Sequence, residues 1–210
     1  MTSAEVREAV SKGAVVLDMR PPKPFAIEHL PGAVNFQFNR ADLAERAEMS
    51  LPQDLTYIIH AEPEPIAKIA SGILANAGFT VLGHLAGGLK QWKADGQATE
   101  PLPLLTVDEL KDALDQYHVV DTREGFEFRF GHIPGSTCLE WTEPWAVMES
   151  LESDKPLALV CGDQVRSAYV ASVLQRAKKN AALVFGGMVD WLERGYPVEK
   201  SPKKPKTPNP

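Results

Sequence analysis

The sequence has few cysteines and no long apolar run. Its two cysteines, Cys138 and Cys161, are too few for a disulfide framework in a chain of 210 residues. No apolar run approaches the roughly 18 residues that cross a membrane. The first ten residues, MTSAEVREAV, lack the apolar core of a secretion signal. We therefore expect a cytoplasmic protein with both thiols free and no membrane partner.

Positive charge is also scarce outside the C-terminal end. The net charge is -6, and four of the lysines lie in the last eleven residues, KSPKKPKTPNP, so the rest of the chain is more acidic still. An acidic body argues against nucleic acid as a partner, because phosphate contacts need clustered lysine and arginine. Residues 200–210 contain no apolar side chain to bury, and we expect a disordered basic tail there.

The chain contains two related halves. Residues VVLDMR and HLPG of the first half recur as VVDTR and HIPG in the second, 103 positions later, and GGLKQW recurs as GGMVDW. Each half opens with a capping box, Thr2 with Glu5 and Thr106 with Glu109. This repetition predicts two units, 1–97 and 104–199, joined by a Pro-containing linker, 98–103. The recurring residues are Asp18, Arg20, His29, Pro31 and Gly32, matched by Asp121, Arg123, His132, Pro134 and Gly135.

Within each half, short apolar strands alternate with helical patterns. The strand-like runs are VVLD, TYIIH and TVLGH in the first half, and HVVD, LALV and AALVF in the second. Such alternation is typical of a parallel sheet with helices on both faces. The predicted fold class is therefore α/β, with two similar domains in tandem. Because both halves repeat the Asp, Arg and His residues, we interpret these three as structural.

Cys161 lies where chemistry is found in a parallel sheet, just beyond the carboxyl end of a strand. It follows LALV and begins a turn that leads into a helix near position 167. Amide N–H groups in such a turn, and the positive end of the helix dipole, favour a thiolate. Arg166 adds a fixed positive charge. Cys161 is therefore a candidate nucleophile, and the alternative is a small core residue.

These motifs resemble those of the rhodanese (sulfurtransferase) family, present twice in tandem. The resemblance rests on VVDTREGFEFRFGHIPGS, CGDQVRSA and GGMVDW. It implies that Cys161 takes a sulfane sulfur from a donor such as thiosulfate or 3-mercaptopyruvate, becomes a persulfide, and passes the sulfur to cyanide or a thiol. It further implies no metal or organic cofactor. In such a site the backbone amides from Gly162 through Arg166 hold the persulfide, and Arg166 binds the donor.

Two residues of the loop depart from the family pattern. Gln164 stands where many members have glycine, and its side chain would narrow the mouth of the loop or supply a hydrogen bond. Asp163 places a negative charge beside the thiol, which disfavours a dianion such as thiosulfate. Val165 completes the four residues between cysteine and arginine. A cysteine phosphatase needs one residue more there, which argues against that activity.

The first half lacks the corresponding chemistry. Its equivalent run is IIHAEPEPIA, and we interpret His60 as standing in place of the cysteine. Two prolines remove amide N–H groups, and two glutamates repel anions. We therefore expect an inactive first unit that docks on the second and forms one wall of the cleft. This internal pairing is compatible with a monomer or a homodimer.

The sequence is also compatible with a second function, and the roles of several side chains follow only as expectations. A rhodanese-like scaffold with an idle cysteine would be a non-catalytic binding or regulatory module. We expect Cys138 in or near the core, and Phe126, Phe128 and Phe130 in packing roles. Trp141 and Trp145 either line the cleft or pack between the two units.

Overall fold

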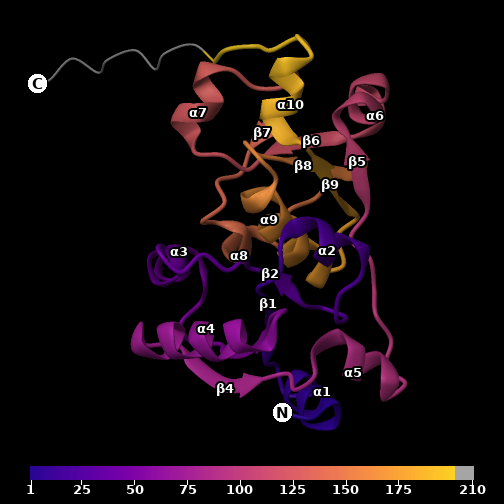
Figure 1. The fold of residues 1–210 in the computed structure, drawn as a ribbon. Coiled ribbons are helices and arrows are strands. Elements are labelled where there is room, and N and C mark those ends of the chain that lie inside the picture. Colours follow the sequence, from indigo (N-terminus) through magenta and orange to yellow (C-terminus); the bar gives the residue numbers. More distant parts are fainter. Residues whose placement is uncertain (202–210) are drawn as a thin grey trace, which may run out of the picture.

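The computed structural model describes residues 1–201, which form two α/β units that follow one another along the chain (Figure 1). The first unit lies at the bottom of Figure 1, in indigo to magenta, and the second lies above it. None of the helices in this part of the chain is long and apolar enough to cross a membrane. The predicted tail, 200–210, lies outside the described residues apart from Lys200 and Ser201.

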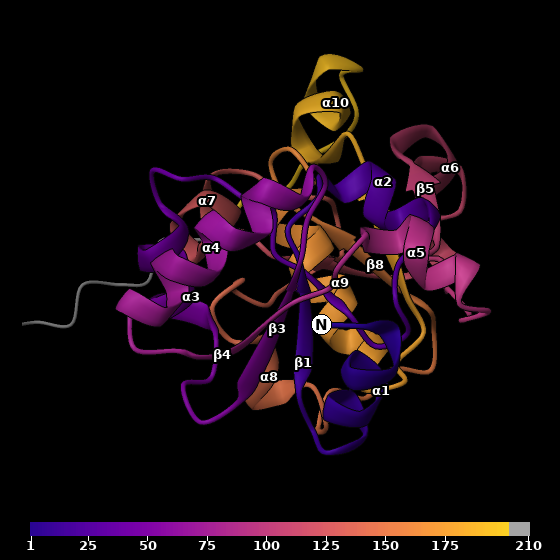
Figure 2. The ribbon, with the colours of Figure 1, turned by 60° about the horizontal axis from the view of Figure 1, so that its bottom comes forward.

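The first unit contains a four-stranded parallel sheet with the order β2-β1-β3-β4. Figure 2 shows β1 and β3 between α3 and α4 on one side and α1 and α5 on the other. This arrangement explains why β1 is apolar and fully buried along most of its length. The elements are α1 (Ser3–Ser11), β1 (Val15–Asp18), α2 (Pro22–Ile27), β2 (Val34–Asn35), α3 (Leu43–Ser50), β3 (Thr56–His60), α4 (Glu64–Asn76), β4 (Thr80–His84) and α5 (Gly88–Ala94).

The second unit contains a five-stranded parallel sheet with the order β5-β9-β8-β6-β7. Its additional edge strand, β5, pairs with β9 and is not predicted from the sequence. The fold class predicted from the repeat is confirmed. The elements are β5 (Leu104–Thr106), α6 (Val107–Asp112), a 3-10 turn (Leu114–Gln116), β6 (His118–Asp121), α7 (Gly125–Phe130), β7 (Thr137–Cys138), α8 (Pro144–Val147), β8 (Leu157–Val160), α9 (Val165–Arg176), β9 (Ala181–Phe185) and α10 (Gly187–Glu193).

The repeated polar residues have structural roles, as predicted. Arg20 donates to both carboxylate oxygens of Asp18 in the first unit, and Arg123 donates in the same way to Asp121 in the second. Both pairs are buried. Two predicted capping boxes, at Thr2 and Thr106, are also present. Each histidine ring of the repeat stacks on the aromatic ring four residues before it, at 3.9 and 3.7 Å between centroids.

Three sequence expectations about apolar packing are wrong. Cys138 lies on the short edge strand β7 and is exposed. Phe126 and Phe130 are 51% and 76% exposed, and only Phe128 packs, against His132. A six-residue helix at the surface cannot turn three alternating rings to the same buried face, which accounts for the difference.

Helix α9 joins the two units. It lies between the β8–β9 part of its own sheet and β2 of the first unit (Figure 1). The helix carries apolar or small residues around its circumference, and eight consecutive residues, 167–174, are buried. A helix that is apolar on all sides needs a partner on each side. Hydrogen bonds fix the contact: the backbone N–H of Asn35 donates to Ser172 Oγ (2.9 Å), and Arg176 Nη1 donates to the Gly32 carbonyl (2.9 Å).

Candidate active site

Cys161 is the first residue after β8, and it is fully buried. The loop backbone is held by the start of α10. Met188 N donates to the Cys161 carbonyl (2.7 Å), and Val189 N donates to the Gly162 carbonyl (3.1 Å). Gly187, with φ +58°, permits this approach, because a Cβ atom there would lie 2.4 Å from the Cys161 carbonyl oxygen. The second glycine of the GGMVDW motif is therefore what allows α10 to clamp the loop.

Three donors converge on the Cys161 sulfur. The backbone N–H groups of Gln164 and Ser167 lie 3.2 and 3.4 Å from Sγ, and the Ser167 hydroxyl lies 3.3 Å away. Donors aimed at sulfur stabilise its anionic form, whether thiolate or persulfide. Ser167 is buried, and sequence reasoning missed it. Its signal was available, because it follows the loop arginine and opens the first turn of a helix.

The loop amides form only part of the expected cradle. Val165 N donates to Asp163 Oδ1 (3.2 Å) and is therefore unavailable to a sulfur ligand. The same carboxylate oxygen lies 3.9 Å from Cys161 Sγ, within reach of the thiol proton. Asp163 thus accepts from the loop backbone and faces the nucleophile.

Gln164 supplies a hydrogen bond, one of the two effects expected of its side chain. Its Oε1 accepts from Gly186 N at 3.1 Å, which ties the loop to α10 a second time. Its backbone has φ +83°, in the left-handed region that non-glycine residues seldom adopt. The cost of this conformation is offset by the bond to Gly186.

Arg166 is already paired within the second unit. Its Nη1 and Nη2 donate to the two carboxylate oxygens of Glu127 on α7, at 2.5 and 2.9 Å. The bonds to Arg166 lower the pKa of Glu127, and Glu127 in turn raises the pKa of Arg166. Sequence reasoning assigned the arginine to the donor and missed Glu127. The bridge connects the start of the loop helix to α7.

Both units line a cleft of about 540 Å³ at the mouth of the loop. A narrow recess of about 30 Å³ continues from it and is lined by Trp141 and Tyr169. Trp145 lies behind this recess and donates from Nε1 to Tyr169 Oη (2.8 Å), while Tyr169 Oη donates to the Ser50 carbonyl of the first unit. Trp141 therefore lines the recess beside the cleft, and Trp145 packs where the units meet. The cleft residues are Gln37, Asn39, Asp42 and Arg46 of the first unit, and Gly162, Asp163, Val165, Arg166 and Val189 of the second.

A family model described as Rhodanese-like domain matches residues 2–95 and again residues 106–194. The chain belongs to the rhodanese-like domain family. It is 30% identical over 91 residues to the thiosulfate sulfurtransferase GlpE of Ectopseudomonas mendocina, covering 43% of this chain and 80% of that protein. It is 30% identical over 100 residues to the adenylyltransferase and sulfurtransferase UBA4 of Lodderomyces elongisporus, covering 43% of this chain and only 22% of that protein's length.

Two solved structures are similar to parts of this chain. A rhodanese-related protein from Thermoplasma volcanium is 33% identical and covers 47% of this chain and 99% of its own, with a TM-score of 0.46. A thiosulfate sulfurtransferase from Pseudomonas aeruginosa is 20% identical and covers 95% of this chain and 43% of its own, with a TM-score of 0.42.

In the first rhodanese-like unit, the strand register corrects the position assigned to His60. Asp18 pairs with His60 in the first sheet, whereas its counterpart Asp121 pairs with Val160 in the second. His60 is therefore the counterpart of Val160, and the residue after it, Ala61, is the counterpart of the nucleophilic cysteine. Because side chains alternate along a strand, this one-residue difference places His60 on the opposite face of the sheet.

The same spacing of 100 residues shows what else the first unit lacks. It relates the helix-capping residues Ala77 and Ala177, so it holds through the helix that follows the loop. Ala67 then replaces the serine that donates to sulfur, and Ile66 replaces the loop arginine. The arginine's partner is lost as well. At the spacing of 103 residues that relates α2 to α7, Pro24 stands where the second unit has Glu127. The cysteine, a side-chain donor to its sulfur and both halves of the bridge are absent together.

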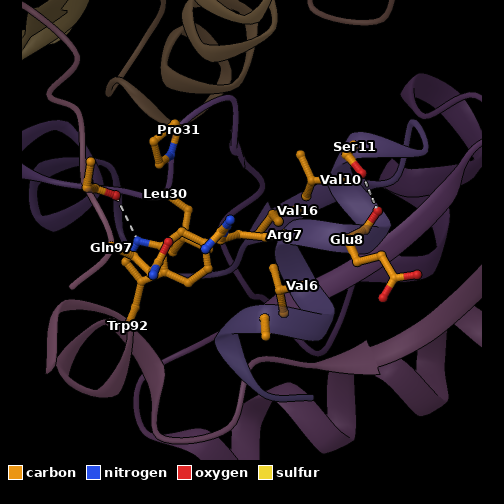
Figure 3. A pocket seen from close by; sticks show the side chains of 12 residues that line it. Val6, Arg7, Glu8, Val10, Ser11, Val16, Leu30, Pro31, Trp92 and Gln97 are labelled. Atoms are coloured by element: carbon orange, nitrogen blue, oxygen red, sulfur yellow. Dashed lines mark hydrogen bonds between the residues drawn. The ribbon is translucent and has the colours of Figure 1, made fainter. Parts of the chain in front are cut away.

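A separate hollow of about 580 Å³ lies in the first unit beside α1 (Figure 3). Figure 3 shows Trp92 and Gln97 on one side of it and Val6 and Val10 of α1 on the other. In the second unit the corresponding place is filled by Tyr196, whose ring lies against that of Trp191 at 5.1 Å. No residue of either loop lines the hollow, so it is not part of the candidate active site.

Proposed function

We propose that the second unit is a sulfurtransferase in which Cys161 carries a sulfane sulfur as a persulfide. The observation that carries the proposal is the convergence of three donors on a cysteine sulfur at the end of a parallel strand. Such a site suits a group that is an anion both before and after it receives sulfur. The sulfurtransferase names of two relatives, each about a third identical or less, support the same class of reaction.

The reaction proceeds in two displacements. The Cys161 thiolate attacks the outer sulfur of a donor such as thiosulfate, a new S–S bond forms, and sulfite leaves with the electron pair of the old bond. With 3-mercaptopyruvate the C–S bond breaks instead, and the thiol proton passes to carbon to give pyruvate. The terminal persulfide sulfur is then attacked by cyanide or a thiol, and the Cys161 thiolate is restored. These transfers involve no net oxidation by an outside agent and no organic cofactor.

The loop residues divide the work of this cycle. Asp163 Oδ1 faces the thiol and is the proposed acceptor of its proton when the thiolate forms. The Gln164 and Ser167 amides hold the charged sulfur. The Gly162 carbonyl accepts from Val189 N of α10, and Arg166 keeps the loop in place through Glu127. The first unit completes the cleft and contributes no nucleophile.

A second candidate function is a non-catalytic binding or regulatory module. The pairing of Arg166 with Glu127 favours it, because this arginine does not extend freely into the cleft. The negative charge of Asp163 beside the sulfur also favours it, since a dianionic donor would be repelled.

Intact-mass measurement after exposure to sulfur donors separates the two. Thiosulfate, 3-mercaptopyruvate and inorganic polysulfide are each incubated with the protein. We expect an added mass of one sulfur atom, which cyanide removes. Cys161→Ser abolishes it, and Cys138→Ser, the matched control for the second thiol, retains it. If no donor adds sulfur to the folded protein, the sulfurtransferase proposal is wrong and the binding module stands.

A further inference from the structure

We propose that Arg46, which belongs to the inactive first unit, binds the anionic group of the sulfur donor. The inference rests on the proposed sulfur transfer at Cys161 and adds the residue that recognises the substrate. The donor class it implies has a carboxylate or sulfonate at the end opposite to the transferred sulfur.

Arg46 lies in the cleft that leads to the loop of Cys161. Arg46 and Arg166 are the two cations among the described residues that line the cleft of about 540 Å³. They also line the narrow recess beside Trp141 together. Arg46 thus faces the loop of Cys161 from the opposite wall, across the space that a donor must enter.

Arg46 has a free hydrogen-bond donor among the described residues, whereas Arg166 is paired. Arg166 has both terminal nitrogens on Glu127, so its charge is neutralised within its own unit. Arg46 Nε donates to Asp42 Oδ1 (2.8 Å) and Nη2 donates to the Gln37 carbonyl (2.7 Å). Its Nη1 has no hydrogen-bond partner within residues 1–201. The Nη1 group of Arg46 is therefore available to a ligand.

The Arg46 side chain is already held in place before a ligand binds. The Arg46 guanidinium lies over the Phe36 ring at 5.0 Å, and its side chain is only 20% exposed. A half-buried guanidinium fixed by two bonds and an aromatic face loses little freedom when it binds an anion. Asp163 stands close to the sulfur, so the favourable place for the donor's negative charge is the far wall, where Arg46 lies.

The test uses four variants in a Cys138→Ser background, so that Cys161 is the thiol observed. Arg46→Gln removes the proposed contact, and Asp42→Asn removes the carboxylate that competes for it. Asp42 makes no side-chain cap to α3, so the substitution leaves the helix start intact. The double variant checks that exposure of Asp42 is not the cause of an effect. Arg40→Gln is the matched control, because Arg40 is exposed on the same segment and does not line the cleft.

The measured quantity is the second-order rate of sulfur loading from thiosulfate and from 3-mercaptopyruvate. We expect Arg46→Gln to lose about 10- to 100-fold, as for a charge-assisted hydrogen bond, and the double variant to lose as well. Asp42→Asn should load sulfur faster, and Arg40→Gln should load it at the rate of the background protein. A merely structural role would make both single variants slower. Loss with one donor alone identifies whether sulfonate or carboxylate is the group recognised.

Alkylation of Cys161 keeps this test separate from the proposed function. Iodoacetate and iodoacetamide differ in charge and attack the same thiolate, so their rate ratio reports anion binding even if no donor loads sulfur. We expect Arg46→Gln to lower the rate with iodoacetate relative to the rate with iodoacetamide, and Asp42→Asn to raise it. Unchanged ratios in both variants would overturn the role of Arg46, whatever the sulfur-loading assay shows.

Discussion

In the first unit the chain passes from β3 to α4 through Ala61, Glu62 and Pro63, and in the second it passes from β8 to α9 through Cys161, Gly162, Asp163 and Gln164. The strands and helices on either side match. The short connections differ in every property that a sulfur site needs. The comparison teaches that the thiol, the donors to its sulfur and the supporting Arg–Glu bridge occur together in one unit and are missing together from the other.

The units also differ in what they do with the cleft. The second unit provides Cys161 and the loop, and the first provides the facing wall around Arg46. The helix that carries the loop, α9, is buried against β2 of the first unit. The unit without a nucleophile therefore supports the loop helix and shapes the entry to the site.

Moving the thiol to the first unit gives the largest expected effect. In a Cys161→Ser background we expect Ala61→Cys to load no sulfur from thiosulfate, because Ala67 offers no hydroxyl and the Arg–Glu bridge that supports the loop is missing. Intact mass after donor treatment checks this, and circular dichroism confirms folding. Loading at a rate comparable to that of the parent protein would show that the loop surroundings do not make the site.

Replacing His60 with its counterpart in the second unit is expected to stabilise the protein. Neither ring nitrogen of His60 has a hydrogen-bond partner within the described chain, and the residue is fully buried. His60→Val removes these unsatisfied atoms and should raise the free energy of unfolding by about 1–3 kcal/mol. Urea denaturation at pH 7 measures it. A clear loss of stability would contradict the assignment of His60 to the place of Val160.

The same variant is expected to change the pH dependence of stability. Burial lowers the pKa of His60 from its ordinary value of 6.5. Below that pH the unfolded chain binds a proton that the folded chain does not, so stability falls as the pH drops below 6.5. His60→Val should reduce this fall between pH 7 and 5, leaving the part due to His29, whose pKa burial also lowers. An identical pH profile would contradict the assignment.

Breaking the Arg–Glu bridge tests the loop support that the first unit lacks. Glu127→Gln and Arg166→Gln should each destabilise the protein, with a coupling energy of about 1–2 kcal/mol in a double-mutant cycle. Arg166 lowers the pKa of Glu127, so this stabilisation is present above the ordinary value of 4.5 and disappears as the pH falls through the folded pKa. Additive effects of the two substitutions at pH 7 would show that the bridge does not act as a unit.

The smallest expected effect concerns the hollow beside α1. Gln97→Tyr supplies the ring that fills the same place in the second unit and should stabilise by about 1 kcal/mol. The reverse substitution, Tyr196→Gln, should destabilise by a similar amount or more, because it also breaks the bond to Asp108. Thermal unfolding of both variants checks the pair. An equal loss of stability in both variants would show that the hollow beside α1 and the place that Tyr196 fills are not equivalent.

Much of the fold follows from the sequence because the repeat is visible in it. Capping boxes, the recurring Asp–Arg pair and short apolar strands each act locally, so their patterns predict the elements correctly. Strand β5 is too short, and too poorly alternating, to be predicted. The burial of α9 against the first unit depends on contacts between distant segments, which no local pattern encodes.

The candidate site was predictable in part. Cys161 at the end of β8 follows from strand pattern and position. The partner of Arg166 does not, because Glu127 lies 39 residues away on another helix. His60 was misplaced because it ends its strand, and the sequence does not show whether the last strand residue or the first loop residue matches Cys161. The pairing of β1 with β3, compared with that of β6 with β8, identifies Ala61.

Cys138 provides the internal comparison for the central claim. The residue is exposed, but its sulfur is partly buried near the Arg123 carbonyl, and this burial raises the pKa of its thiol to about 11. Most of it stays protonated at neutral pH, so it is a poor nucleophile. We therefore expect sulfur donors to modify Cys161 and to leave Cys138 unmodified.

The most direct measurement follows one sulfur atom through the protein. The outer sulfur of thiosulfate is isotopically labelled, the treated protein is digested without reducing agent, and the labelled peptide is identified. We expect the label on the peptide that contains Cys161, and its release as thiocyanate when cyanide is added. Label on Cys138, label that cyanide does not release, or no label from any donor would contradict the account.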